Sequence, residues 1–175
     1  MRKLRLEELN RLSISEYKES SKLAVTVVLD NIRSAHNVGS IFRTVDGLGI
    51  QQIYLCGITA RPPHKEINKS AIGATNSVSW EYHEDISDIL TTLKSDHCLI
   101  GIEQTTESKE LTKFDFPKSE KLVLIFGNEV DGISENILPL LDHSLELAQF
   151  GTKHSFNVAV CAGMVLWETA RQLRS

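Results

Sequence analysis

The chain has 175 residues, of which 41% are hydrophobic and 24% are charged. This length and composition fit one globular domain that buries a core, and no second domain is expected. The N-terminus is charged and amphipathic, and no run of about eighteen apolar residues occurs, so neither secretion nor a membrane span is predicted. Cys56, Cys98 and Cys161 are far apart and lack C-x-x-C spacing, which argues against a disulfide framework or a metal site and favours a reducing cytoplasm.

The formal net charge is −4, but it is unevenly distributed. Residues 1–70 hold eleven Lys and Arg against seven Asp and Glu, whereas residues 71–175 hold eight against sixteen. An anionic partner would therefore meet the first part of the chain. Basic residues near a terminus can also serve only to solubilise a surface helix, so charge alone does not decide between these interpretations.

In chain order, leucines at near-helical spacing predict a short amphipathic helix over residues 2–12, followed by a linker to residue 23. A mostly β-branched run predicts the first strand over residues 24–29. Apolar residues then recur at helical spacing over residues 37–49, and glycines end that pattern. The sequence thus predicts a helix, a buried strand and a second helix.

The remaining elements alternate between strands and helices. Strand-like runs cover residues 52–56, 78–82, 98–102, 122–126 and 144–147, and helical stretches cover 84–94 and 134–141. This alternation predicts an α/β fold with a mostly parallel sheet covered by helices on both faces. Polar, turn-rich residues 59–64 and 104–113 are the expected mobile loops. Residues 154–174 are apolar almost all round, which predicts a helix buried in the core or against a second subunit.

Three polar segments follow or precede these elements in positions typical of functional sites. The first, residues 30–44, follows a strand and runs into a helix, where α/β proteins place ligands. Asn37 can be a helix cap or a site residue. Arg43 lies among apolar residues of the same helix, so its guanidinium requires either an anionic ligand such as an RNA phosphate or a salt bridge within the core.

The second segment, residues 122–134, is a buried strand that breaks into the turn Gly127-Asn128-Glu129. Such a turn lets backbone amides approach a ligand closely, although it can also be an ordinary connection. The chain has no G-x-G-x-x-G and no G-K-[ST] motif, so a dehydrogenase or an NTPase is not favoured. The third segment, residues 147–160, combines a strand end, a glycine turn and the start of the last helix, where Ser155 or Asn157 can cap and His154 is an ordinary loop residue.

In this order and spacing, the three segments resemble the three motifs of the SpoU/TrmH class of SPOUT methyltransferases, over about residues 24–174. The resemblance implies a methyltransferase domain at 24–175 behind an N-terminal region at 1–23, and a C-terminal part that threads into a deep trefoil knot. It also implies a cytoplasmic homodimer that uses S-adenosylmethionine, without a metal, to methylate a ribose 2′-hydroxyl in structured RNA and releases S-adenosylhomocysteine. The RNA is tRNA or rRNA, with tRNA favoured. A catalytically silent RNA-binding relative is the alternative.

The resemblance further implies roles for individual residues. The cofactor would contact Gly127, Asn128, Glu129, Leu147, Gln149, Phe156 and Asn157, and the active site would comprise Asn37, Arg43, Glu129, Ser155 and Asn157. Gln149 and Phe156 differ from the family's usual residues in shape only. Because an arginine in a protein rarely gives up its proton, Arg43 is expected to position phosphate and ribose in the active dimer, and the general base stays open.

The basic residues of the first part of the chain form the expected RNA-facing surface, because cations that neutralise phosphates dominate affinity for nucleic acids. These residues are Arg2, Lys3, Arg5, Arg11, Arg33, Arg61, Lys65 and Lys69.

Overall fold

The protein is described by a computed structural model that covers residues 1–175, except for the side chain of Leu6. One sheet runs through the molecule in the order β3-β2-β1-β6-β4-β7-β5. Its strands are β1 (Leu23–Asp30), β2 (Ile50–Cys56), β3 (Ser79–His83), β4 (His97–Ile102), β5 (Lys109–Glu110), β6 (Lys121–Phe126) and β7 (His143–Glu146). All of the pairings between these strands are parallel, which confirms the predicted sheet.

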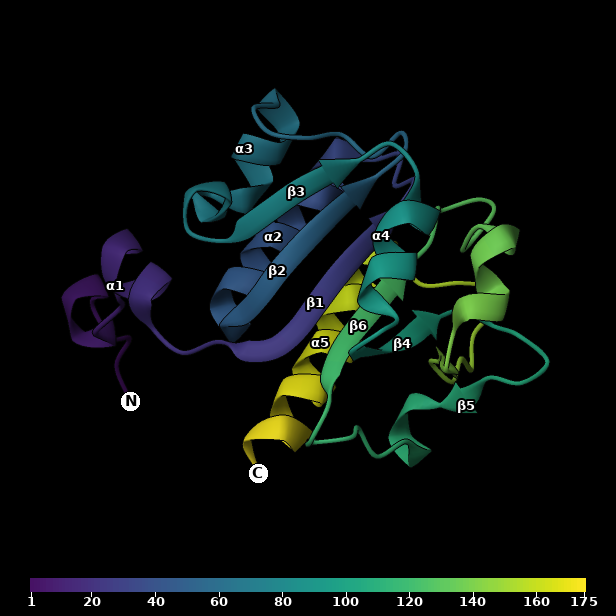
Figure 1. The fold of residues 1–175 in the computed structure, drawn as a ribbon. Coiled ribbons are helices and arrows are strands. Elements are labelled where there is room, and N and C mark those ends of the chain that lie inside the picture. The colour runs from purple at the N-terminus through teal and green to yellow at the C-terminus, as the bar shows by residue number, and fades with distance from the viewer.

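Helices cover both faces of this sheet (Figure 1). The α-helices are α1 (Ile14–Glu19), α2 (Ala35–Leu48), α3 (Lys65–Ala71), α4 (Ile86–Leu93) and α5 (Val158–Arg174). The 3-10 helices are η1 (Leu6–Leu9), η2 (Ala74–Asn76), η3 (Leu111–Lys113) and η4 (Glu135–Leu140). Residues of α2, α3 and α5 pack in one core cluster, and residues of α4 and η4 pack in another on the opposite face. No helix in the described part of the chain is both long and apolar enough to cross a membrane.

The central strand β1 explains why the sequence reads there as a continuous apolar run. Val27 and Leu29 belong to the cluster under α2 and α5, whereas Val28 belongs to the cluster under α4. All three side chains are fully buried. A strand that is buried on both faces has no polar alternation to show.

Gly39 fixes the position of α2 against α3. A Cβ at this residue would lie 2.1 Å from Ser70 Oγ and 2.5 Å from the Ile67 carbonyl oxygen, so only glycine allows the two helices to approach this closely. The N-terminus of α2 is capped by Ser34, whose hydroxyl accepts a hydrogen bond from the Asn37 N–H at 3.3 Å. The Asn37 side chain is therefore free for another role.

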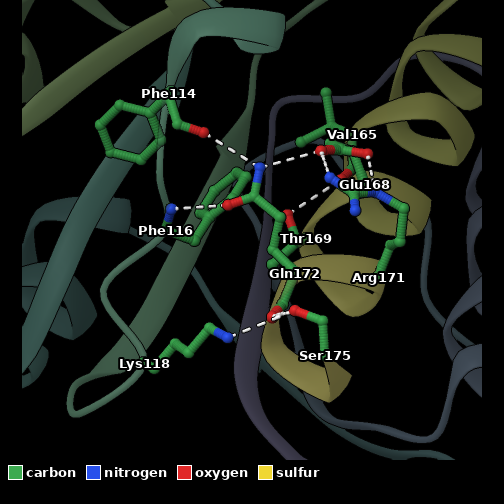
Figure 2. Close-up of polar contacts among 9 residues, drawn as sticks. All are labelled: Phe114, Phe116, Lys118, Val165, Glu168, Thr169, Arg171, Gln172 and Ser175. Atoms are coloured by element: carbon green, nitrogen blue, oxygen red, sulfur yellow. Dashed lines mark hydrogen bonds and ion pairs between the residues drawn. The ribbon is translucent and has the colours of Figure 1, made fainter.

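The C-terminal helix is fastened to the segment that leads into β6 (Figure 2). The Gln172 side chain accepts a hydrogen bond from the Phe116 N–H at 2.9 Å and donates to the Phe114 carbonyl at 3.0 Å. The same amide donates to Glu168 at 2.9 Å. These contacts fix the C-terminal end of α5 to the segment that precedes β6.

Several predicted elements differ from the structure at the N-terminus. The helix predicted over residues 2–12 is wrong: η1 ends at Leu9, and the next residue, Asn10, adopts a left-handed conformation with φ 47°. A separate helix, α1, starts at Ile14 and is capped by Ser13, whose hydroxyl accepts from the Glu16 N–H while the Glu16 carboxylate accepts from the Ser13 N–H. These elements stand to the left of the sheet in Figure 1.

Three further predictions need correction. Helix α3 was not expected after the loop at 59–64, and the expected loop at 104–113 contains the short strand β5. The stretch at 134–141 is a 3-10 helix containing Pro139, which lacks an N–H for an α-helical bond. The last helix starts at Val158 rather than His154, because the Asn157 side chain accepts from the Ala159 and Val160 N–H groups and caps it.

Candidate functional site

A cavity of about 540 Å³ lies at the carboxyl ends of β4, β6 and β7, where a parallel sheet presents its loops to a ligand. All of the residues assigned to the cofactor from the sequence line it: Gly127, Asn128, Glu129, Leu147, Gln149, Phe156 and Asn157. Ser155 lines it as well. The second and third polar segments, distant in sequence, thus form the two walls of one pocket.

The wall formed by the second segment is a tight turn closed by its own backbone. Asn128 and Gly132 exchange two N–H to carbonyl hydrogen bonds, at 2.8 and 3.0 Å. The Asn128 side chain accepts from the Val130 and Asp131 N–H groups. A Cβ at Gly127 would lie 2.2 Å from backbone atoms of Gly132 and Ile133, so glycine is required at this position.

Glu129 links the turn to the first segment. Its carboxylate accepts hydrogen bonds from the backbone N–H groups of Arg33 at 2.9 Å and Ser34 at 3.2 Å, and from the Asn37 side-chain amide at 3.0 Å. The Asn157 amide in turn donates to the Asn37 side-chain oxygen at 3.2 Å. The chain Glu129–Asn37–Asn157 therefore joins all three polar segments, and each of these residues was singled out from the sequence.

This network also changes the acidity of Glu129. Burial raises the pKa of its carboxyl, but the hydrogen bonds from the Arg33 N–H and the Asn37 amide outweigh burial, so the pKa of Glu129 lies below its usual value. Glu129 is thus a carboxylate near neutral pH. It is better suited to fix the turn and accept hydrogen bonds than to donate a proton.

The wall formed by the third segment is anchored by hydrogen bonds to the backbone carbonyl of His154. The side-chain amides of Gln104 and Gln149 both donate to the His154 carbonyl oxygen, at 2.8 and 3.1 Å. Phe156, which follows, keeps 42% of its surface exposed. Gln149 therefore has a structural role in this chain: it anchors the loop that carries Ser155 and Phe156.

The pocket is acidic. Glu103, Glu129 and Glu146 line it, and no Lys or Arg is among the lining residues that the structure describes. The Glu103 carboxylate accepts from the Ile133 N–H at 3.0 Å and the Gln104 N–H at 2.9 Å, which places it against the turn of the second segment. Such a lining favours a ligand that carries a positive charge.

Sequence reasoning missed Glu103 and Glu146. Glu103 directly follows β4, and Glu146 ends β7, so both lie at the same edge of the sheet as the predicted site. Their position at strand ends was a usable signal, but it required the pairing of β4 with β6 and β7 to be known. Cys161 also lines the pocket, where burial and the nearby Glu103 raise the pKa of its thiol to about 11. That thiol is therefore protonated near neutral pH.

Arg43 lies elsewhere. It is exposed on α2, and it lines a separate hollow of about 300 Å³ with Asp46, Ile72 and Ser77. Six residues separate it from Asn37, which in an α-helix corresponds to about 9 Å along the axis and roughly 120° around it. Arg43 is therefore not among the residues that line the pocket of its own chain, and it makes no salt bridge with any side chain that the structure describes.

The predicted RNA-facing residues divide into two groups. Arg33 lies in the loop after β1, and Arg61, Lys65 and Lys69 lie in the loop after β2 and on α3, with the Arg61 guanidinium 4.2 Å above the Tyr82 ring. The other group, Arg2, Lys3, Arg5 and Arg11, belongs to the N-terminal region, where Arg2 pairs with Glu8. The two groups thus belong to separate elements of the fold.

Among the side chains that the structure describes, no three of His, Cys, Asp and Glu are grouped so as to hold a metal ion. The pocket's chemistry is that of backbone groups, amides and carboxylates.

Comparison with known proteins agrees with this geometry. The family model described as the SpoU rRNA Methylase family matches residues 24–167. The chain belongs to the SpoU methylase family. The match spans all three polar segments, from β1 through most of α5, so both walls of the pocket lie within the family's region of similarity.

Individual relatives point the same way. The chain is 28% identical to a tRNA (guanosine(18)-2′-O)-methyltransferase from Thermus thermophilus over 166 residues, which is 94% of this chain and 84% of the relative. The crystal structure of a TrmH/SpoU tRNA modifying enzyme from Aquifex aeolicus has the same fold, with a TM-score of 0.81 and 24% identity over 92% of this chain and 82% of that one. A structure of an rRNA methyltransferase from Sinorhizobium meliloti with AdoMet bound has a TM-score of 0.80 and 24% identity, over 91% of this chain and 61% of that one.

Proposed function

We propose that this SpoU-family protein transfers the methyl group of S-adenosylmethionine to a ribose 2′-hydroxyl in structured RNA, with tRNA favoured over rRNA. The observation that carries the proposal is the single cavity lined by every residue assigned to the cofactor from the sequence. The Thermus thermophilus relative is named for tRNA guanosine 2′-O-methylation and aligns over 94% of this chain, which supports tRNA as substrate.

The cavity fits the proposed cofactor in charge and in shape. S-adenosylmethionine supplies an activated methyl group on a positively charged sulfur, and the acidic lining of Glu103, Glu129 and Glu146 suits a cation. The bare backbone at Gly127 lets a ligand contact main-chain amides and carbonyls directly. Phe156 and Leu147 supply apolar surface for the neutral parts of the molecule.

The residues at the mouth of the pocket position the acceptor. Ser155 lines the cavity and makes no side-chain hydrogen bond in the described part of the chain, so its hydroxyl can meet the ribose. Asn157 and Asn37 hold each other and Glu129, which fixes the geometry at which an oxygen approaches the methyl carbon. The Arg43 guanidinium would bind phosphate and stabilise negative charge on the ribose oxygen, and the group that takes the proton is not assigned.

This assignment of Arg43 requires a homodimer, in which Arg43 of one protomer completes the pocket of its partner. Helix α5 supports it: Val160, Met164 and Trp167 form an exposed apolar stripe, with Trp167 62% exposed. A surface of this kind favours burial against a second protomer.

A test of this arrangement is to mix two inactive variants. Arg43→Ala keeps the cofactor pocket, and Leu147→Trp blocks it while keeping Arg43. Heterodimers of the two would contain one complete site, so co-expression should restore about one quarter of the activity. No restoration, with dimers confirmed by sedimentation, would contradict a site shared between protomers.

The deep trefoil knot of the family is also part of the proposal, together with a methyltransferase domain at 24–175, an N-terminal region at 1–23 and a cytoplasmic location. Support for the knot comes from the position of α5. This helix follows β7 in the chain, yet its Gln172 hydrogen-bonds to the segment that leads into the central strand β6. Mechanical extension from the two ends tests the knot, because a knotted chain extends less than an open chain of 175 residues.

The proposed cytoplasmic location fits the three free cysteines, which are typical of a reducing compartment.

The decisive experiment measures methyl transfer. Purified protein with labelled S-adenosylmethionine and total tRNA or rRNA should incorporate label, and mass spectrometry of the digested RNA should locate it on a 2′-O-methyl nucleoside. Arg43→Ala should reduce transfer by at least a hundredfold while leaving cofactor binding unchanged. Binding of S-adenosylmethionine and RNA without turnover would favour the alternative, a catalytically silent RNA-binding relative.

A further inference from the structure

A second hollow, of about 470 Å³, lies beside the edge strand β3 and is separate from the cofactor pocket. Its walls include Pro62 and Pro63 from the loop after β2, Asn68 from α3, Asn76 from η2 and Trp80 from β3. No charged side chain is among the described residues that line it. The hollow therefore offers flat, uncharged and partly apolar surface.

Trp80 is the one aromatic residue among the described residues that line this hollow. It is half-buried, pairs in register with Ile53 of β2, and packs against the core cluster under α2 and α3. Two consecutive prolines, whose rings fix the backbone φ angle, line the same hollow. An aromatic ring held by a sheet beside a conformationally restricted loop offers a surface on which another planar ring can stack.

The polar groups of the hollow are two free amides. The side chains of Asn68 and Asn76 are exposed and make no hydrogen bond within the described part of the chain. Each amide carries a donor and an acceptor, which is the pattern that matches the edge of a nucleobase.

The rim of the hollow is cationic. Arg61, Lys65 and Lys69 are exposed beside it, and the lysines are four residues apart on α3, so they share a face of that helix. Arg61 is held over the Tyr82 ring at 4.2 Å. Glu66 is the one carboxylate on α3. A neutral hollow inside a cationic rim is complementary to a nucleotide, whose base is uncharged and whose phosphate is anionic.

We propose that this hollow binds an unpaired base of the RNA substrate, with the flanking phosphates on Arg61, Lys65 and Lys69. This inference rests on the proposed RNA methylation. Strand β3 lies three strands from β6, or roughly 14 Å at the usual strand spacing, so the bound base belongs to a different nucleotide from the one that is methylated.

Hydrogen bonds connect this surface to the catalytic edge. The Asn31 side-chain oxygen, in the loop after β1, accepts from the Ile58 N–H at 3.1 Å, in the loop after β2. The Asn31 carbonyl accepts from the Asn128 side chain at 2.6 Å, in the cofactor turn. Hydrogen bonds thus link the loops after β6, β1 and β2, and the loop after β2 continues to Pro62 and Pro63 of the hollow.

Tryptophan fluorescence tests the proposal directly, because the chain has two tryptophans, Trp80 and Trp167. In a Trp167→Phe background, Trp80 is the sole emitter. Titration with short single-stranded RNA of each base should quench its fluorescence saturably, since bases stack on aromatic side chains. The same RNA backbone made abasic should not quench. Equal quenching by abasic RNA would overturn the proposal.

Substitutions of exposed residues distinguish recognition of the base from attraction of the phosphate. Asn68→Ala with Asn76→Ala should raise the Kd for base-containing RNA roughly tenfold and leave the Kd for abasic RNA unchanged. Lys65→Ala with Lys69→Ala should raise both Kd values and lower the salt dependence. Unchanged binding by the double asparagine variant would also overturn the base site.

Methyl transfer by the wild-type protein keeps the two proposals distinguishable. Transfer to RNA without quenching of Trp80 would contradict the base site and leave the methyltransferase proposal intact. Quenching by base-containing RNA in a protein that transfers no methyl group would support the base site and contradict the proposed activity.

Discussion

The turn at Gly127 gives the sharpest prediction about the cofactor pocket. In a Gly127→Ala protein, the new methyl group would lie 2.2 Å from the carbonyl carbon of Gly132 and 2.2 Å from the nitrogen of Ile133. Both are backbone atoms, so no side-chain rotation can relieve the contact. Ordinary contact begins at 3.4 Å, and the turn must therefore open by about 1.2 Å.

An opening of this size breaks both backbone hydrogen bonds between Asn128 and Gly132, which now measure 2.8 and 3.0 Å. Each bond contributes about 0.5–1.5 kcal/mol, and the overpacking that remains costs about 1–3 kcal/mol. We expect a loss of about 2–6 kcal/mol in the free energy of unfolding, or roughly 10 °C in Tm for a chain of this size. Because the displaced turn is one wall of the cavity, the Kd for S-adenosylmethionine should rise at least tenfold.

Gly151→Ala is the matched control, because Gly151 belongs to the third polar segment, does not line the cavity, and a Cβ there meets no atom within 4 Å. Urea denaturation and calorimetric titration of the cofactor should show little change for this control, apart from a gain of up to about 1 kcal/mol in stability. Equal stability and equal cofactor affinity for Gly127→Ala and the wild type would refute the assignment of Gly127 to a backbone contact that glycine alone permits.

Three other changes have defined outcomes. The folded pKa of Glu129 is lowered, so the stability it contributes is complete above the unfolded pKa of about 4.3 and is lost as pH falls through the folded pKa. In urea denaturation, the difference in free energy of unfolding between wild type and Glu129→Gln should therefore shrink below about pH 4. A difference that does not change with pH would contradict the network. Gly47→Ala places a methyl group in α2 with no atom within 4 Å and should raise the free energy of unfolding by about 0.5–1 kcal/mol in the same assay, whereas a loss would reveal an unseen contact. In calorimetry, Glu103→Gln should weaken the binding of S-adenosylmethionine roughly tenfold more than the binding of S-adenosylhomocysteine, whose sulfur is uncharged. Equal weakening of both would contradict a role for the charge of Glu103.

Much of the fold could be predicted because its strands and longer helices carry strong patterns. Helix α2 shows apolar residues at helical spacing and ends at Gly49, whose φ of 60° is left-handed, as its position after the helix suggests. The short helices α1 and α3 escaped this reasoning, because six or seven residues hold too few apolar positions to establish a period. Their starts were marked only by caps at Ser13 and His64.

The pocket could be predicted only as far as its residues are contiguous in sequence. Gly127-Asn128-Glu129 and Ser155-Phe156-Asn157 are compact polar segments next to strands or helices, and both line the cavity. Glu103 and Gln104 reach the same cavity through the pairing of β4 with β6 and β7, which no local pattern records. Gln104 matters because its amide donates to the His154 carbonyl, fifty positions away in the sequence. The Gln149 amide donates to the same carbonyl.

The two residues proposed for catalysis on α2 illustrate what one rigid helix can coordinate. Asn37, in its first turn, is fixed to Glu129 and Asn157 in the pocket of its own chain. Arg43, about 9 Å further along and on another face, is exposed. Between them, Gly39 allows α2 to pack closely against α3, which fixes the position of the helix that carries both residues. The same helix would thus hold one pocket in shape and present a guanidinium to another, which ties the proposed activity to the proposed dimer through the orientation of α2.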